Sequence, residues 1–319
     1  MNNIIAITIG DIKGIGIELL LKIYLQKKEC KFILFTNRRI FKNYLVKNKI
    51  KISFKLINDN LKNLNKLDYK NNFYIYDFDA KNNEQNAYLA LKEAYIFTKQ
   101  RIFSGIITLP LNKNKIINKI DSSFIGQTEY FQKLDNKKLS NMIFVSNKLI
   151  ITTLTTHIPL NQINLYLKKR NYIYEKIKNI NKILINNFKI KKPKLLIMGL
   201  NPHAGENGNI GKEENVILIP IIKKLKKENY LISGPKSADS IFNSDNLKKY
   251  DCFISMYHDQ ALIPFKLISQ YSGLNYTGGI SINRVSPDHG TAYDVVGKNK
   301  GNSKSLLYCF NMLKKITHR

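Results

Sequence analysis

Cysteine is scarce in this chain, and its placement excludes a fold built on disulfides. The three cysteines, Cys30, Cys252 and Cys309, are odd in number, far apart and free of any CxxC spacing. That pattern fits a reducing cytosol and argues against a thiolate zinc site. The N-terminus lacks a basic signal-peptide region, and no apolar run approaches the roughly 18 residues of a membrane span. We therefore expect a cytoplasmic protein with no membrane partner.

Acidic residues are also few, with 23 Asp and Glu against 52 Lys and Arg and a formal charge of +29. Clustered basic residues bind nucleic acid, usually through arginine forks. Here only six of the 52 are Arg, which leaves 46 Lys, spread along the whole chain together with Asn and Ile. This dispersal indicates compositional drift over solvated surfaces. We expect no nucleic-acid partner, only a mild preference for anionic ligands.

Short apolar runs alternate with longer segments of helical periodicity, which predicts α/β architecture with a mainly parallel sheet. The predicted strands are 4–9, 31–36, 73–76, 105–109, 142–145, 149–154, 194–198, 230–233 and 252–256. The predicted helices are 17–26, 83–99, 127–134, a broken helix over 160–188, 213–228 and 303–316. The length of 319 residues favours two domains or one large one.

Four of the five histidines lie in polar clusters directly after apolar runs, whereas His318, next to the last residue, is expected to be inert. His157, His203 and His258 follow predicted strands in TTHIPL, GLNPHAGE and SMYHDQ. Three imidazoles from separate loops can bind a divalent metal and leave a position open for substrate. The alternative, three unrelated loop histidines that cap helices or bind backbone, stays open at this point.

Other polar residues suit an oxygen-rich anion. Lys266, Asn275 and Arg284 follow His258 within one stretch, and Arg and Lys bind phosphate or carboxylate. The loop GDIKGIGIE (10–18) follows a strand and opens a helix, with glycines that allow close approach to a ligand. It matches neither the Rossmann fingerprint nor a Walker A motif, so by itself it is weak evidence of ligand binding.

A series of motifs runs along the chain in the order TIGDIKGIGIE, TLPLNK, GQTE, THIPL, GLNPHAGENGNIGKEE, GPKSAD, MYHDQALIPFK and RVSPDHGTAYDVVGK. Taken together, these motifs closely resemble the 4-hydroxythreonine-4-phosphate dehydrogenase family of vitamin B6 biosynthesis. The resemblance runs over essentially the whole chain, and GLNPHAGE, MYHDQ and DHGTA are each specific to it.

The resemblance implies two α/β/α domains like those of isocitrate and isopropylmalate dehydrogenases, with the active site in the interdomain cleft. The expected nucleotide-side domain is 1–128 plus 276–319, and the central domain is 129–275. Members of the family are homodimers, and each active site contains residues from both subunits. NAD or NADP is expected along Gly290, Thr291 and Asp294, and one divalent ion (Zn, Mg or Co) at His157, His203 and His258.

The implied reaction oxidises 4-phosphooxy-L-threonine, a small phosphorylated hydroxy-amino acid, to a β-keto acid that decarboxylates to 3-amino-2-oxopropyl phosphate. The implied substrate contacts are Gln127, Thr128, Lys266, Asn275 and Arg284, with Lys266 also the catalytic candidate. Gln127 stands where the family has His, and it cannot carry a proton at pH 7. The loop 10–18 also lacks two family prolines.

Three alternatives remain open. A dehydrogenase of a related phosphorylated sugar acid, such as phosphothreonate or phosphoerythronate, would share the histidine set. Gln127, in place of the family's His, is also consistent with a drifted homologue of low activity or with a non-catalytic binding protein of the same fold.

Overall fold

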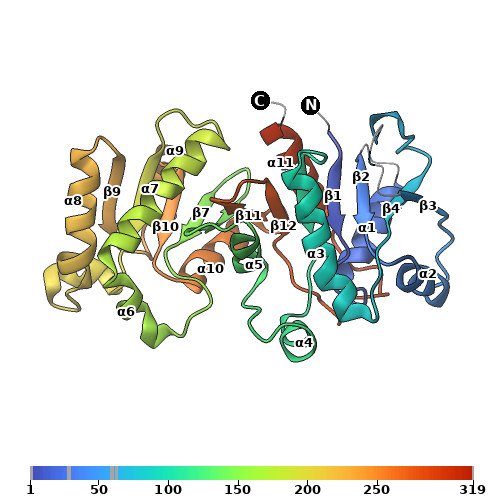
Figure 1. The fold of residues 1–319 in the computed structure, drawn as a ribbon. Helices are drawn as coiled ribbons and strands as arrows, with labels where there is room; N and C mark the ends of the chain where they lie inside the picture. Colours follow the sequence, from blue (N-terminus) through green and yellow to red (C-terminus); the bar gives the residue numbers. More distant parts are fainter. Residues whose placement is uncertain (1–2, 27–29, 58–60, 62–63, 318–319) are drawn as a thin grey trace. The chain divides into compact units, whose positions relative to one another are not determined.

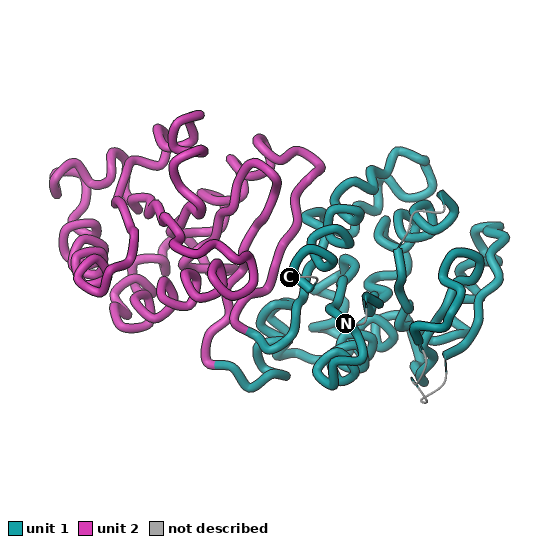
Figure 2. The backbone as a smooth tube through the Cα atoms, turned by 90° about the horizontal axis from the view of Figure 1, so that it is seen from above, with its two compact units in different colours: residues 1–137, 280–319 teal, residues 138–279 magenta. Residues whose placement is uncertain are grey.

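The computed structural model describes residues 3–26, 30–57, 61 and 64–317, which form two compact units. Unit 1 comprises residues 1–137 and 280–319, and unit 2 comprises residues 138–279 (Figure 2). The chain thus passes between the units at 137/138 and 279/280, whereas the sequence places the domain boundaries at 128/129 and 275/276. The predicted inert His318 lies outside the described residues.

Unit 1 contains a parallel sheet whose strand order in the described residues is β3-β4-β2-β1-β5-β12 (Figure 1). These strands are β1 (Ile5–Thr8), β2 (Phe32–Phe35), β3 (Phe54–Ile57), β4 (Phe73–Tyr76), β5 (Gly105–Thr108) and β12 (Arg284–Pro287). The three central strands β1, β2 and β5 are buried throughout, as expected for a parallel sheet covered on both faces.

Helices cover both faces of the unit 1 sheet. They are α1 (Ile15–Leu25), α2 (Arg38–Lys47), α3 (Asn83–Lys99), α4 (Lys113–Lys119), α5 (Gln127–Leu134) and α11 (Lys304–Thr317), with a 3-10 turn η1 (Leu64–Lys66). Phe32 and Phe73 on one face contact rings from α1, α2 and α11. On the other face, Phe35 and Tyr76 pack against Phe97 of α3. Alternate strand residues therefore face opposite helical layers.

Unit 2 contains a mixed sheet in the order β11-β6-β7-β10-β8-β9 among its described residues. The strands are β6 (Asn141–Val145), β7 (Ile150–Thr153), β8 (Lys194–Met198), β9 (Leu231–Lys236), β10 (Cys252–Ser255) and β11 (Leu274–Gly278). The pairs β7–β10, β10–β8 and β8–β9 are parallel, whereas β6 is antiparallel to both β7 and β11. The carboxyl ends of β7, β10 and β8 therefore share one edge of the sheet.

Two separate hydrophobic clusters cover the faces of the unit 2 sheet. Leu195 and Ile197 of β8 pack with α6 (Ile163–Leu167), α7 (Arg170–Asn186) and α8 (Ile219–Lys227). Leu196 and Met198 pack on the opposite side with α9 (Ser244–Lys249) and α10 (His258–Ser269). Shorter turns complete the unit: η2 (Leu160–Gln162), η3 (Pro202–Gly208) and the π-helical η4 (Glu214–Leu218).

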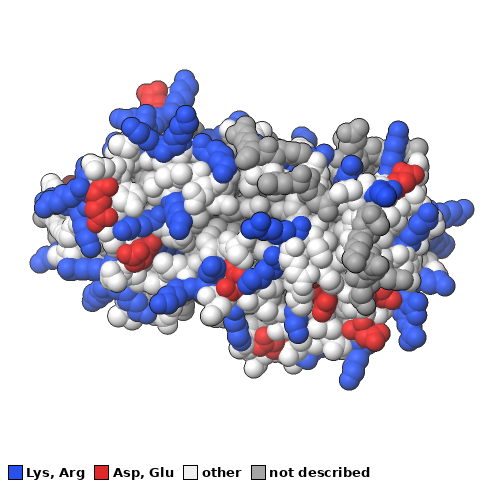
Figure 3. Space-filling model, turned by 45° about the horizontal axis from the view of Figure 1, so that its top comes forward, with Lys and Arg blue, Asp and Glu red and all other residues white. Residues whose placement is uncertain are grey.

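The α/β class predicted from the sequence is confirmed, and the break predicted within 160–188 is the junction of η2, α6 and α7. Strands β3, β11 and β12 and helices α2, α4, α9 and α10 were not predicted. The polar residues of β11, β12 and α10 mark those segments as loops. Within the described residues, no helix is long and apolar enough to cross a membrane. On the face drawn in Figure 3, Lys and Arg side chains are scattered among uncharged residues.

Candidate active site

Asp11 links two of the motifs that the sequence singles out in unit 1 to helix α4. Its carboxylate is 8% exposed and accepts hydrogen bonds from Tyr293 Oη (2.5 Å), Lys115 Nζ (3.1 Å) and Lys13 N (2.9 Å). Burial raises the pKa of Asp11, but these donors outweigh it, so the net pKa is lowered. A buried carboxylate thus joins the loop after β1, helix α4 and the loop after β12.

The predicted nucleotide loop rests on the start of α1. Ile15 N donates to Thr291 O at 2.9 Å, and a Cβ on Gly14 would lie 3.1 Å from the same oxygen. A Cβ on Gly290, in contrast, would meet no atom within 4 Å, and Asp294 is exposed. The loop is therefore fixed to the fold on one side and open on the other, which leaves room for a cofactor.

Arg284, predicted to hold an anionic group, is 2% exposed and engaged within unit 1. Its Nε donates to Thr108 Oγ1 at 3.0 Å, and its Nη2 donates to Thr108 Oγ1 and to Gln127 Oε1. Burial lowers the pKa of Arg284 to about 10, so the guanidinium stays charged at neutral pH. The Arg284 side chain is thus held in a defined position by hydrogen bonds inside the fold.

Gln127, the residue that replaces the family's His, is the first residue of α5. Its Oε1 accepts from Arg284, and its Nε2 donates to Leu109 O at 3.3 Å. The adjacent Thr128 is 5% exposed. An amide can satisfy both neighbours without a proton change, so Gln127 is a stable partner for Arg284 across the whole pH range.

In unit 2, the three histidines predicted to bind metal follow three neighbouring parallel strands: His157 after β7, His258 after β10 and His203 after β8. The rings of His157 and His258 lie 5.7 Å apart between centroids. His258 opens α10, and its Nδ1 lies 2.7 Å from Asp259 Oδ1. If Nδ1 donates to Asp259, Nε2 of His258 is left as the metal-binding nitrogen.

Gln260 fixes the MYHDQ segment to the neighbouring strand end. Its Oε1 accepts from Met256 N at 2.7 Å, and its Nε2 donates to Gly199 O at 2.8 Å. The side chain therefore links the carboxyl ends of β10 and β8, from which His258 and His203 emerge.

His203 does not join the other two imidazoles within the single chain. It lies in a left-handed turn and lines a recess of about 580 Å³ with Lys223 and Gly234. Among the described residues, no three His, Cys, Asp or Glu side chains form a group that could hold a metal ion. The chain alone thus brings together two of the three predicted ligands.

The two remaining predicted residues of unit 2 differ in exposure. Lys266 is exposed on α10, eight residues after His258 and so about 12 Å along the helix axis. Asn275 lies on β11, and its buried Oδ1 has no hydrogen-bond partner among the described residues. A buried amide oxygen without a donor is a plain candidate for ligand contact.

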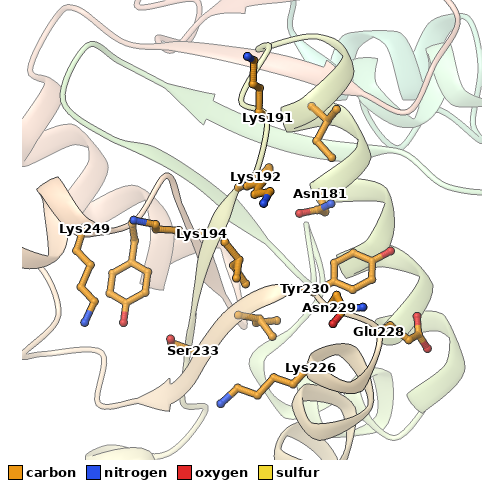
Figure 4. Close-up of a pocket in the computed structure, with 15 residues that line it drawn as sticks. Asn181, Lys191, Lys192, Lys194, Lys226, Glu228, Asn229, Tyr230, Ser233 and Lys249 are labelled. Atoms are coloured by element: carbon orange, nitrogen blue, oxygen red, sulfur yellow. The ribbon is translucent and has the colours of Figure 1, made fainter.

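A further recess of unit 2, about 890 Å³, lies away from the histidines (Figure 4). Five lysines line it: Lys191, Lys192, Lys194, Lys226 and Lys249. It is near the amino ends of β8 and β9, opposite the strand ends that carry the histidines. Lysine is abundant over the whole chain, so this enrichment does not define a ligand.

The sequence analysis did not single out the acids Asp11, Asp135 and Glu214, which are all buried. Asp11 and Glu214 lie within Gly-rich motifs, which is the signal that could have found them, whereas nothing local marks Asp135.

Comparison with known proteins covers nearly all of the chain. Residues 28–313 match the family described as "Pyridoxal phosphate biosynthetic protein PdxA". The 4-hydroxythreonine-4-phosphate dehydrogenase of Aquifex aeolicus (strain VF5) is 35% identical, over 99% of each chain. That of Sulfurihydrogenibium sp. (strain YO3AOP1) is 34% identical over 95% of each. The crystal structure of the Klebsiella pneumoniae 4-hydroxythreonine-4-phosphate dehydrogenase is 25% identical, with a TM-score of 0.84, over 99% of this chain and 100% of that one.

Proposed function

This chain belongs to the PdxA family of pyridoxal phosphate biosynthetic proteins, and on that premise we propose that it oxidises 4-hydroxythreonine-4-phosphate with NAD or NADP and one divalent metal ion. The observation that carries the activity is its identity of 34–35% with dehydrogenases of that name over at least 95% of both chains. The protein is therefore an oxidoreductase of pyridoxal phosphate biosynthesis, and we place it in the cytoplasm.

The proposed metal ligands are His157, His203 and His258, which emerge at one edge of three adjacent parallel strands. Nδ1 of His258 faces Asp259, an arrangement that orients a metal-binding imidazole. Nitrogen donors favour zinc or cobalt over magnesium. When bound, the divalent ion supplies Lewis acidity to the hydroxyl being oxidised, and the nicotinamide accepts the hydride.

The proposed substrate contacts differ in the charged group of the substrate that each of them binds or stabilises. The Arg284 guanidinium and the Asn275 amide bind the anionic groups, and Thr128 and Gln127 contribute at the start of α5. The Lys266 ammonium stabilises the enolate left when the β-keto acid loses carbon dioxide to give 3-amino-2-oxopropyl phosphate. Gly290, Thr291 and Asp294 line the cofactor, because Gly290 faces open space and Asp294 is exposed.

We further propose that a homodimer completes the metal site. The support is that the single chain pairs His157 with His258 but leaves His203 outside the pair. A second copy that supplies the missing imidazole would bring the donor number to three, the usual count of protein ligands at a catalytic metal.

The test is a heterodimer of His203→Ala and His258→Ala chains, purified through two different tags. If these two ligands reach one metal from opposite subunits, each homodimer is inactive and the heterodimer keeps one intact site of two, or about half of wild-type activity. Activity of the heterodimer no higher than that of the homodimers excludes sharing between these two residues. A chelator should abolish NAD(P) reduction by the wild type, and added cobalt should restore it.

A substitution at Gln127 tests whether the substrate is instead phosphothreonate or phosphoerythronate. The two possible substrates are distinguished by measuring steady-state kcat/KM on both of them, for the wild type and for Gln127→His. We expect the phosphorylated hydroxythreonine to be preferred and Gln127→His to change kcat/KM less than about tenfold, because Gln127 already satisfies Arg284. A higher kcat/KM on the sugar acid would overturn this assignment.

A further inference from the structure

The segment that carries His203 has an uncommon backbone. Residues 203–207 all have positive φ, including His203 (50°), Ala204 (52°) and Glu206 (43°). A left-handed conformation costs an L-residue roughly 1–2 kcal/mol. Such a run persists only when surrounding contacts fix it, and these conformations concentrate at functional sites. The contacts that hold this turn should therefore control where His203 points.

Glu214 is a buried residue that contacts the segment just before this turn. It is 1% exposed, and its Oε1 accepts from Leu200 N at 2.7 Å and from Asn201 N at 2.8 Å. Its Oε2 accepts from Asn201 Nδ2 at 2.9 Å, and the same amide donates to Glu213 Oε2 at 2.8 Å. No Lys, Arg or His of the described residues forms an ion pair with Glu214, so hydrogen bonds from residues 200 and 201, just before the turn, compensate its charge.

Two glycines show how closely this carboxylate is packed against the turn. A Cβ on Gly205 would lie 2.6 Å from Glu214 Oε2, and one on Gly211 would lie 2.2 Å from Asn201 Nδ2. The glycines and glutamates of GLNPHAGENGNIGKEE are thus parts of one packed unit at the end of β8.

We infer that Glu214 is a positioning residue: its buried carboxylate holds the backbone of residues 200 and 201, and thereby fixes the left-handed turn that presents His203. This inference deepens the proposed function and rests on it, since it gives His203 a fixed place for metal binding. Glu214 itself touches neither substrate nor cofactor in this role.

The test compares cobalt binding by Glu214→Gln, wild type and a control, followed by the visible absorption of Co²⁺. A glutamine oxygen can still accept from both backbone amides, but its NH2 then faces the Asn201 NH2, donor against donor. We expect Glu214→Gln to bind cobalt about 10- to 100-fold more weakly, the usual effect of losing an outer-shell contact. Hydrogen exchange of amides 200–207 should also quicken.

The matched control is Asp135→Asn in unit 1, which also removes a buried carboxylate that accepts a backbone N–H. It should lower stability without changing cobalt affinity, which separates positioning from general destabilisation. If Glu214→Gln does not fold, Asn201→Ala removes the same amide bridge and must show the same weakened binding.

Cobalt affinity within twofold of the wild type in whichever of the two variants folds overturns the inference. Failure of the proposed metal site has a different signature: His203→Ala would then bind cobalt as the wild type does. In that case, the hydrogen exchange of Glu214→Gln still decides whether Glu214 fixes the turn.

Discussion

The predicted substrate residues of unit 1 and the predicted metal ligands of unit 2 are held in different ways. Arg284 and Gln127 are bonded to one another, and Arg284 lies inside the fold. His157 and His203 are exposed and adopt left-handed backbone, with φ of 34° and 50°. Folding of the chain alone thus sets the Arg284 geometry, whereas in the proposed metal site a second copy is needed to bring His203 to the other two histidines. Substitution of Arg284 should therefore lower both stability and activity, whereas substitution of the histidines should lower activity alone.

The largest expected effect is the loss of activity in His258→Ala. Losing an outer-shell partner of a metal ligand typically costs 10- to 100-fold, so losing a ligand itself should lower kcat/KM by more than about 100-fold. The side chain is 39% exposed, so the free energy of unfolding should change little. Paired assays of NAD(P) reduction and urea unfolding measure both. Normal turnover in this variant would remove His258 from the proposed site.

Arg284→Met should also lower activity, because the guanidinium is a proposed substrate contact, but here a clear loss of stability is added. The change leaves the oxygens of Thr108 and Gln127 without the Arg284 donors, which should lower the free energy of unfolding by about 1–3 kcal/mol. Urea unfolding of Arg284→Met beside His258→Ala is the direct comparison. Equal stability losses in both variants would erase the contrast between the two regions.

The stability that Asp135 contributes should depend on pH, which gives a further test of the comparison between the two regions. Asp135 accepts hydrogen bonds from Tyr95, which comes before the chain leaves unit 1, and from Ser281, which comes after the chain has re-entered unit 1. Although burial raises its pKa, hydrogen bonds from Ser281, Tyr95 and Lys99 bring the pKa down to about 2. A pKa lowered on folding stabilises the protein above the unfolded value near 3.8, and this contribution is lost as pH falls toward 2.

The wild type should therefore exceed Asp135→Asn by about 2 kcal/mol at pH 7, and the difference should shrink between pH 4 and 2. Unfolding of both proteins over this range is the measurement. A difference that does not depend on pH would show that Asp135 acts without its charge.

The smallest expected effect is a gain. His203→Gly relieves the left-handed strain at φ 50° and should stabilise the protein by about 0.5–1 kcal/mol while abolishing metal binding. His203→Ala loses the imidazole but keeps the strained conformation, so it is the matched control. If the Gly variant is no more stable than the Ala variant, the turn is not strained.

Local sequence pattern was enough for much of the fold. The segments 73–76, 83–99, 127–134 and 194–198 were predicted with the bounds of β4, α3, α5 and β8, because apolar periodicity and Asn or Gly caps mark their ends. Helix α10 was missed because an internal proline, Pro264, and a polar start, YHDQ, are more typical of a loop than of a helix. Strands β11 and β12 were missed because Asn275 and Arg284 mark those stretches as a binding site.

The site residues were identified through family motifs, whereas their support was not visible in the sequence. Nothing local predicts that Gln127 bonds Arg284, 157 residues away, or that five consecutive residues after Pro202 turn left-handed. Both depend on long-range contacts, which a pattern of residue types does not encode.

The most direct test of the central claim is an anomalous scattering map of crystals of the assembled protein grown with cobalt. The account predicts one peak per chain, about 2.0–2.1 Å from ring nitrogens of His157, His203 and His258, contributed by one or two subunits. Peaks that involve none of these nitrogens, or His203 rings remote from every cobalt ion, would contradict it.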